Sequence, residues 1–344
     1  MGCDILPCGQ QRWREWKITG TPFKLYGAGA RALITSPGES LSHPQPAARP
    51  NREPARRVTE EMRPGRTPLC AHPEWARAFP WVVQGTTVRG GGKARDGSRN
   101  RAARAGADAD FGLFTGAPTG EVMKRWESLA EDTGCGSMVH ARQVHGCSVA
   151  LHEATPQGLL LAPPCDGHAT RQAGTLLAVS VADCVPVFVI APPARAVMLL
   201  HAGWRGVAGG ILEAGLAMLE RDFGTHARET HMHMGPAICG RCYEVGPEVH
   251  AALGLPRPAS PGQPVDLRRV LADRALAAGA DPAQLTTSTF CTRCADAPFF
   301  SHRAGDAGRQ IAVLGIIPDN SAPPEGAWLD DHRRKPHRQP MEDR

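Results

Sequence analysis

The sequence predicts an α+β fold, with mixed β-sheets flanked by helices in a single compact domain. Short runs rich in Val, Leu and Ile have the length and composition of buried strands and are flanked by Pro and Gly. They lie at Leu176–Val181, Val185–Ile190 and Ala196–Leu200, with a further strand predicted at Gln310–Ile316. These strands do not alternate regularly with helices, which favours mixed sheets over a doubly wound fold.

Two helices are predicted from apolar residues that recur at helical spacing. The segment 207–223 carries Val207, Ile211 and Leu216 on one face, as expected of a helix that covers a core. Gly224 follows it and is a candidate C-terminal cap. The segment Leu267–Ala278 has the same amphipathic pattern and predicts a second helix.

The composition divides the chain into three parts. Residues 1–72 are expected to be a disordered N-terminal extension, or the product of a start codon placed too far upstream, with Met62 as one candidate start. Their stretch 40–54 (SLSHPQPAARPNREP) is rich in Pro and Arg and has no apolar period, so burial cannot offset the entropy of ordering it. The folded domain is expected over 75–317 and a flexible C-terminal tail over 318–344. Gly90–Gly106 is expected to be a mobile basic loop.

Composition also limits the class of protein. Of the 344 residues, 42% are hydrophobic, which is sufficient for a substantial core. We find no apolar run of about 18 residues, so no membrane span is expected. The N-terminus has no apolar signal-peptide core either, so a cytoplasmic location is expected. The net charge of +5 falls within residues 1–72, and the near-neutral remainder predicts no nucleic-acid or membrane surface.

Three separated segments carry side chains suited to metal chemistry. They are ARQVHGCSV (141–149), VADCVPV (181–187) and HAGWRG (201–206), and they place His145, Cys184 and His201 at predicted strand ends or turns. One thiolate and two imidazoles suit Zn²⁺, and three protein ligands leave a fourth position open for water. Metal binding lowers the pKa of such a water towards neutrality. Spacing alone equally allows a buried packing cysteine and structural histidines.

These segments belong to a longer series that resembles a known family, the laccase-domain family. That family is labelled as polyphenol oxidases and is also described as purine nucleoside phosphorylases. The resemblance covers roughly residues 75–317. The matching segments are, in order, QVHG (143–146), DGHAT (166–170), ADCVPV (182–187), HAGWRG (201–206), GPAICGRCYEVGPEV (235–249), FFSHR (299–303) and GRQ (308–310).

The resemblance implies both a metal site and a reaction. By motif, His145, Cys184 and His201 are implied to bind one Zn²⁺. The implied activities are phosphorolysis of adenosine, inosine, guanosine and methylthioadenosine, together with deamination of adenosine. The expected partners are therefore small-molecule purine nucleosides and phosphate, with no nucleic acid and no membrane. The sequence does not predict the oligomeric state.

Charged residues near these motifs are candidates for substrate contacts. Arg205 has the planar donors suited to phosphate and is expected to act in both binding and catalysis. Arg89, in TTVRGG (86–91), and Arg303, in FFSHR, are candidate substrate contacts. These arginines are also compatible with surface ion pairs or basic loops.

Two aspartates are candidates for a supporting role. Asp183, next to Cys184, is expected to be a general base or to orient a histidine, and Asp166 is a similar candidate. Both aspartates also suit turns or caps. Glu244 lies in a family motif without an assigned role.

One segment departs from the family pattern. The Asn-Leu pair that usually follows T-x-R-G-G in the family is replaced by DFGLFTG (110–116), so substrate contacts there are not carried over. Base stacking is expected from an aromatic side chain, and the candidates are Phe114, Phe299, Phe300 and Trp204.

Other functions remain open from the residues. Cys184 with His201 or His145 could form the nucleophile and base of a hydrolase. The family resemblance implies that such an activity, Cys-dependent or zinc-dependent, would be that of an amidohydrolase acting on peptidoglycan precursors. A copper polyphenol oxidase is disfavoured, because such enzymes need several His-x-His pairs and the chain has one, His231-Met-His233.

The cysteines raise a further alternative. The chain has 11 cysteines, and without a secretory signal disulfides are not expected. Cys239-x-x-Cys242 and Cys291-x-x-Cys294 form a pattern typical of structural zinc, although Cys242 and Cys291 are 49 positions apart. The pattern allows a second, structural metal site, a zinc-ribbon interaction module or reduced buried thiols.

Overall fold

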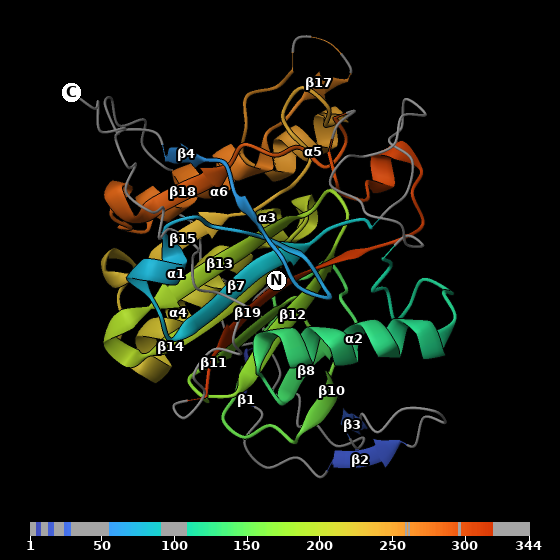
Figure 1. Cartoon of the computed structure of the whole chain (residues 1–344). Helices are drawn as coiled ribbons and strands as arrows, with labels where there is room; N and C mark the ends of the chain where they lie inside the picture. The colour runs from blue at the N-terminus through green and yellow to red at the C-terminus, as the bar shows by residue number, and fades with distance from the viewer. Residues whose placement is uncertain are drawn as a thin grey trace, which may run out of the picture.

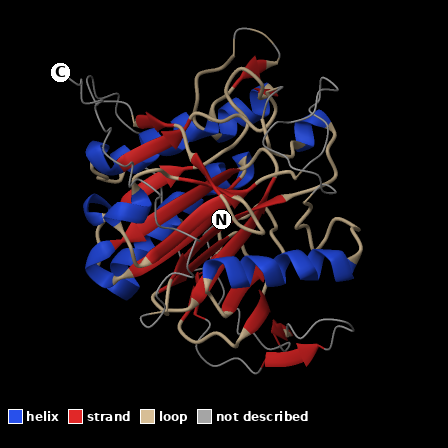
Figure 2. Ribbon diagram, in the orientation of Figure 1, coloured by secondary structure: helices blue, strands red, loops and turns tan. Residues whose placement is uncertain are grey.

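Two large β-sheets pack face to face, with helices on both outer sides (Figures 1 and 2). This computed structural model describes residues 5–7, 13–16, 24–28, 55–90, 109–258, 260, 262–294 and 297–318. Both sheets contain parallel and antiparallel pairs. The predicted α+β class with mixed sheets is therefore confirmed.

The first sheet has eight strands and carries most of the residues discussed below. Its inner strands were expected from the sequence at 185–190 and 196–200. In spatial order the strands are β1 (Ile5–Pro7), β9 (Val149–His152), β11 (Gly167–Thr170), β14 (Ala196–Ala202), β13 (Val185–Ala191), β15 (His231–Met234), β18 (Leu285–Ser288) and β4 (Arg56–Val58).

The second sheet has nine strands and includes those expected at 176–181 and 310–316. Its order is β2 (Trp13–Trp16), β3 (Leu25–Ala28), β10 (Gly158–Ala162), β8 (Ser137–Ala141), β12 (Thr175–Val181), β19 (Gln310–Ile316), β7 (Val82–Thr87), β6 (Leu69–Ala71) and β5 (Glu61–Arg63). A separate ribbon pairs β16 (Glu244–Val245) with β17 (Gln263–Pro264).

Helices cover the outer faces of both sheets. The long α2 (Thr119–Thr133) packs on the nine-stranded sheet, and α4 (Ile211–Phe223) and α6 (Leu267–Ala277) pack on the eight-stranded sheet. The short helices are α1 (Trp75–Ala78), α3 (Trp204–Gly209) and α5 (Pro247–Ala252). In the described part of the chain, none of the helices has the length and apolar character needed to cross a bilayer.

The central strands are nearly continuous apolar runs in the sequence because both of their faces are buried. In β13, Phe188 faces the core between the two sheets and Val187 faces the helices. In β14, Leu199 faces the core between the two sheets and Met198 faces the helices. A strand buried on both faces needs an apolar residue at every position, so the period of two disappears from the sequence.

The helix predicted over 207–223 is interrupted. The structure has α3 and α4 instead, separated by Gly210, whose φ of 84° places it in the left-handed region. A glycine there ends a helix without steric penalty, and Gly224 caps α4 in the same way with φ of 63°. The first helix begins at Trp204, so Arg205 lies in its first turn.

Residues upstream of the expected folded domain contribute strands β1 to β6. Leu69 and Cys70 of β6 are buried, and β4 and β5 place the segment 56–63 in both sheets. Strands of three or four residues are too short to show a period, which is why composition alone suggested an extension without structure. The other residues of 1–72, the Gly90–Gly106 loop beyond Gly90 and the tail after Pro318 lie outside the described residues.

Candidate metal centre

The structure brings His145, Cys184 and His201 together. His145 lies in the turn after β8, Cys184 lies between β12 and β13, and His201 is near the end of β14. Their candidate ligand atoms all lie within 4.8 Å of one another. The two imidazole rings are 4.9 Å apart between centroids and nearly perpendicular, at 79°. Three separated segments thus converge on one point, as their motifs suggested.

The backbone is strained on both sides of this point. His145 has φ of 58° and Asp183 has φ of 91°, both in the left-handed region that non-glycine residues rarely adopt. Strain of this kind costs of order 1–3 kcal/mol per residue and persists where surrounding contacts enforce it. It recurs at ligand clamps and active sites, so the local backbone is consistent with a functional site.

Asp166 holds both histidines in place. Its Oδ1 atom lies 2.9 Å from His201 Nδ1 and accepts a hydrogen bond from the His145 amide at 2.9 Å. Its Oδ2 atom accepts from the amides of Val144 and Gly146, at 3.2 and 2.8 Å. Because His201 Nδ1 is engaged, Nε2 is the ring nitrogen left for the cluster. A buried carboxylate behind a histidine is the arrangement that orients metal ligands in proteins.

The charges within the cluster favour a thiolate. Burial alone raises the pKa of Cys184, but the adjacent His201 charge and hydrogen bonds from His145 and His201 outweigh it and lower this pKa to about 6. For His201, burial lowers the pKa, but the Cys184 thiolate and Asp166 outweigh it and raise the pKa to about 9. The pair therefore holds a thiolate near neutral pH, the form that binds metals and acts as a nucleophile.

Gly203 leaves room for the cluster. A β-carbon at this position would lie 3.0 Å from Cys184 Sγ and 3.1 Å from His145 Cδ2. Contacts this short force a neighbour to move. The glycine of HAGWRG thus has a steric role at the cluster itself.

Replacing Gly203 by alanine is expected to weaken metal binding about 10-fold or more, because small displacements of ligands and their supports have effects of that size. Zinc titration against a competing chromophoric chelator measures the change. Gly120→Ala in α2 is the matched control, since a β-carbon there meets nothing within 4 Å. Wild-type zinc affinity in Gly203→Ala would show that the ligands do not converge at this position.

Asp183 is engaged by other partners than the histidines. Its Oδ1 atom accepts a hydrogen bond from Thr292 Oγ1 at 2.6 Å, and its Oδ2 atom accepts from the Arg303 amide at 2.7 Å. Its carbonyl accepts from the amide of Ile238 at 3.1 Å. Of the two candidate aspartates, Asp166 is therefore the one that orients His201, and Asp183 joins the Cys184 loop to two other segments.

The three candidate arginines differ in their surroundings. Arg205 is exposed, with its guanidinium 4.3 Å from the centre of the Trp204 ring. Arg303 is exposed as well, and its guanidinium donates to the Glu244 carbonyl at 2.7 Å. Arg89 is half-buried and pairs with Asp306 at 2.9 Å.

Tyr243 is a residue at the site that the motifs did not single out. The Arg303 guanidinium lies 4.9 Å from its ring centre. Burial, then the charges of Cys184 and Asp183, raise the Tyr243 pKa to about 12, opposed by Arg303 and Arg205. Tyr243 therefore lies within electrostatic reach of both Cys184 and the two arginines. Its place directly after Cys242 in a family motif was the signal available in the sequence.

Two of the aromatic residues considered for base stacking are buried. Phe299 and Phe300 are 0% and 2% exposed, so neither can present a ring to a ligand in this conformation. Trp204 is half-buried, and Phe114 of the DFGLFTG segment is 58% exposed. Trp204 and Phe114 therefore remain the candidates.

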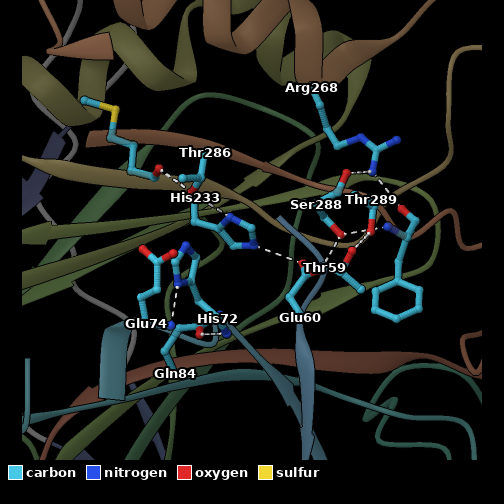
Figure 3. A network of polar contacts seen from close by, with 12 residues as sticks. Thr59, Glu60, His72, Glu74, Gln84, His233, Arg268, Thr286, Ser288 and Thr289 are labelled. Atoms are coloured by element: carbon cyan, nitrogen blue, oxygen red, sulfur yellow. Dashed lines mark hydrogen bonds and ion pairs between the residues drawn. The ribbon is translucent and has the colours of Figure 1, made fainter. Parts of the chain in front are cut away.

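The His231-Met-His233 pair does not form a metal site. His233 is fully buried, with Nδ1 2.9 Å from Thr286 Oγ1 and Nε2 2.9 Å from Glu60 Oε1 (Figure 3). His231 packs edge-on against Phe79. Because both ring nitrogens of His233 have protein partners, this His-x-His pair offers no copper ligand set.

Most of the cysteines in the described part of the chain have free thiols. Those with free thiols are Cys70, Cys135, Cys165, Cys184, Cys239, Cys242, Cys291 and Cys294. Cys147 departs from the expectation, since it is disulfide-bonded. The thiols of the two CxxC pairs are therefore available for metal binding.

A two-sheet α+β fold that carries a His–Cys–His cluster places this chain in the class of laccase-like domains. The chain belongs to the family described as multi-copper polyphenol oxidoreductase laccase, whose model matches residues 86–317. The family resemblance of the motifs is confirmed.

Relatives and solved structures extend this assignment. The purine nucleoside phosphorylase YlmD of Geobacillus stearothermophilus is 34% identical over 260 residues, which are 70% of this chain and 92% of the relative. The adenosine deaminase RL5, from an unknown prokaryotic organism, is 34% identical over 188 residues, or 48% of this chain and 69% of the relative. The crystal structure of YlmD from Geobacillus stearothermophilus is 31% identical and superposes with a TM-score of 0.63, covering 76% of this chain and 99% of that one.

Proposed function

We propose that this chain is a zinc-dependent purine nucleoside phosphorylase that also deaminates adenosine, with methylthioadenosine among its phosphorolysis substrates. The observation that carries the proposal is the convergence of His145, Cys184 and His201 within 4.8 Å. Relatives named as a purine nucleoside phosphorylase and an adenosine deaminase support the choice of substrate class.

The residues of the cluster fit zinc. One thiolate and two imidazoles are a recurring zinc donor set, and three protein ligands leave a position open. Asp166 fixes the ring of His201, and Gly203 keeps the space between the ligands clear. Zinc bound there would supply a Lewis acid and a means of activating water. A His₂Cys set also occurs in mononuclear copper centres. The bound metal must therefore be identified by elemental analysis when the activity is measured.

The surrounding residues are proposed to bind and orient the substrates. In phosphorolysis a phosphate oxygen bonds to ribose C1′ while the bond from C1′ to the purine nitrogen breaks, and the purine leaves after gaining a proton. Arg205 and Arg303 are proposed to hold the phosphate, because guanidinium groups match its geometry. Arg89, at the end of β7, is proposed as a further contact to phosphate or ribose.

Asp183 is proposed to position the Cys184 loop, since Thr292 and the Arg303 amide engage its two oxygens. In deamination, water adds at C6 of adenine and ammonia leaves. Trp204 and Phe114 are proposed to stack on the base, since aromatic side chains bind base faces in this way.

The expected result with the zinc-loaded full chain is that adenosine yields adenine and ribose 1-phosphate only when phosphate is present. Without phosphate, adenosine is expected to yield inosine. His201→Ala is expected to lose the bound zinc and reduce both rates by about 100-fold or more, since it removes a ligand together with its support from Asp166. Chromatography of the products and elemental analysis measure both effects. Formation of neither adenine nor inosine by the zinc-loaded protein would rule out the proposal.

A second candidate is a cysteine amidohydrolase acting on peptidoglycan precursors. The observation that favours it is the proximity of the Cys184 thiol to His201, within 4.8 Å. The lowered pKa of Cys184 and the raised pKa of His201 favour the thiolate–imidazolium state of a nucleophile and acid–base pair. Chelation separates the two functions, because a cysteine dyad keeps its activity without metal. An amidase activity that survives chelation and is lost in Cys184→Ser would support this candidate.

A further inference from the structure

A second cluster of candidate ligands lies beside the first site. The Sγ atoms of Cys239, Cys242, Cys291 and Cys294 all lie within 4.8 Å of one another, and Cys242 Sγ is 3.9 Å from Cys294 Sγ. The two CxxC pairs lie on the loops that follow β15 and β18. A parallel bridge between Ala237 and Cys291 joins the two loops.

We propose that these four cysteines bind a structural zinc ion, separate from the His145–Cys184–His201 cluster. A Zn–S bond is about 2.3 Å, so the sulfur atoms of a tetrahedral Cys₄ site lie about 3.8 Å apart. The observed 3.9 Å between Cys242 and Cys294 matches that separation. It is about twice the length of a disulfide bond, which is near 2.05 Å.

The backbone around the cluster also suits a metal-bound thiolate. The Cys239 amide donates a hydrogen bond to Cys291 Sγ at 3.3 Å, and such a bond stabilises negative charge on sulfur. Gly240, inside the first CxxC turn, lies so close to Asp266 that a β-carbon would be 3.0 Å from the Asp266 side chain. The first turn is therefore held tightly against the start of α6.

A buried network anchors the segment that leads to the second CxxC pair (Figure 3). Arg268 of α6 donates to the carbonyls of Ser288 and Phe290 at 2.8 and 2.7 Å. The Ser288 hydroxyl in turn donates to Glu60 Oε2 at 2.8 Å. Contacts with α6 thus position both CxxC turns so that the four thiols converge.

A metal at this cluster would act on the first site through Asp183. The Ile238 amide, next to Cys239, donates to the Asp183 carbonyl at 3.1 Å. Thr292, next to Cys291, donates to the Asp183 carboxylate at 2.6 Å. One ion that links the two loops therefore fixes both contacts that hold the residue preceding Cys184. An ion bound by Cys242 would also restrain the neighbouring Tyr243. The proposed zinc is thus a support for the geometry of the first site.

The cluster is accessible to ions from solution. A cavity of about 880 Å³ is lined by Cys239, Cys291 and Cys294, together with Arg241. Zinc could therefore enter the folded protein, and a chelator could reach the bound ion. The inference rests on the four thiols and does not depend on the reaction proposed for the first site.

Elemental analysis of the purified full chain tests this site. Two zinc ions per chain are expected in the wild type and one in His201→Ala, whose remaining ion belongs to the four cysteines. Cys294→Ser is expected to lose the ion bound by the four cysteines. Arg241→Ala, which changes a residue between Cys239 and Cys242, is expected to retain this ion. The His201→Ala protein gives a result even where a cysteine variant fails to fold. Absence of zinc from a folded His201→Ala protein would overturn the proposal.

Cobalt substitution identifies the ligands independently of activity. With Co²⁺ in the His201→Ala protein, the visible absorption of a tetrahedral tetrathiolate is expected, and Cys294→Ser is expected to weaken and shift it. Thiol titration under denaturing conditions gives the remaining check. Disulfides within the two CxxC pairs, or one iron per chain in place of zinc, would overturn the assignment of a zinc site.

Discussion

Replacing Asp166 by alanine is expected to lower the free energy of unfolding by about 3–5 kcal/mol, the range for breaking a buried charged pair. Asp166 is fully buried and accepts hydrogen bonds from three consecutive amides and from His201. Alanine leaves all of these donors without their acceptor, and a buried donor without a partner costs about 1–3 kcal/mol. The His145 turn, with its left-handed backbone, loses the contact that enforces it.

The same substitution is expected to reduce zinc affinity by at least about 10–100-fold, the effect of removing the partner of a metal-bound histidine. The stability and zinc affinity of Asp166→Asn are expected to lie between those of the wild type and of Asp166→Ala. In either orientation of the amide, its NH₂ group faces N–H donors that Asp166 accepts from. Urea unfolding and zinc titration measure the two effects. Asp273→Ala is the control, since its ion pair with Arg269 is exposed and worth less than about 1 kcal/mol. Equal stability of Asp166→Ala and Asp273→Ala would contradict the account of Asp166.

The family motifs pointed to His145, Cys184 and His201 as the candidate ligands that the fold brings together, but they did not indicate the role of Asp166. Asp166 and Asp183 both stand beside motif residues, and nothing local distinguishes them. The distinction comes from strand pairing. Asp166 immediately precedes β11, which is antiparallel to β14, and the His201 amide donates to the Asp166 carbonyl at 2.7 Å. Which carboxylate reaches His201 is thus decided by a register that sequence spacing does not contain.

The convergence of the two CxxC pairs likewise could not be predicted from their spacing in the sequence. Their separation of 49 positions is too long for a compact zinc ribbon, so spacing argued against one shared site. In the fold, β15 and β18 are adjacent and parallel, with Met232 opposite Leu285. The loops after adjacent parallel strands leave the sheet at the same edge. The intervening residues form the crossover, which contains α5 and α6, and their number has no bearing on the distance between the thiols.

Acid is expected to destabilise the protein strongly, because several histidines are buried as neutral rings. His140, His152 and His168 are each 0–1% exposed. Burial lowers the pKa of His140 to about 4, against a smaller opposing effect of its bond to the Ala178 carbonyl. Burial lowers the pKa of His152 to about 3. For His168, burial and then the neighbouring His152 and His140 hold the pKa well below its usual value.

The sign of the effect follows from proton linkage. The unfolded chain binds a proton at each of these histidines below about pH 6.5, while the folded chain does not until the pH falls to the lowered pKa. Their contribution to stability is therefore present above the unfolded pKa and is lost as the pH falls. His140 and His152 each account for about 2 kcal/mol lost between pH 7 and pH 5, or about 4 kcal/mol together. His168 acts in the same direction.

The His152–His168 pair offers the sharpest test. His152 Nε2 and His168 Nδ1 are 3.0 Å apart, and the other nitrogen of each ring has no hydrogen-bond partner among the described residues. A proton added to either ring would have no acceptor there. His152→Gln removes one titrating group and keeps an amide that can bond to His168. The loss of stability between pH 7 and pH 5 is therefore expected to be about 2 kcal/mol smaller in His152→Gln than in the wild type.

Urea unfolding at the two pH values measures this difference, and comparison of variants cancels the contribution of metal release at low pH. His302→Gln, which replaces an exposed histidine, is expected to lose as much stability between pH 7 and pH 5 as the wild type. If His152→Gln loses as much stability as the wild type, burial of a neutral His152 does not cause the acid sensitivity. A smaller loss of stability in His152→Gln, together with an unchanged loss in His302→Gln, would assign the effect to the buried His152 of β9.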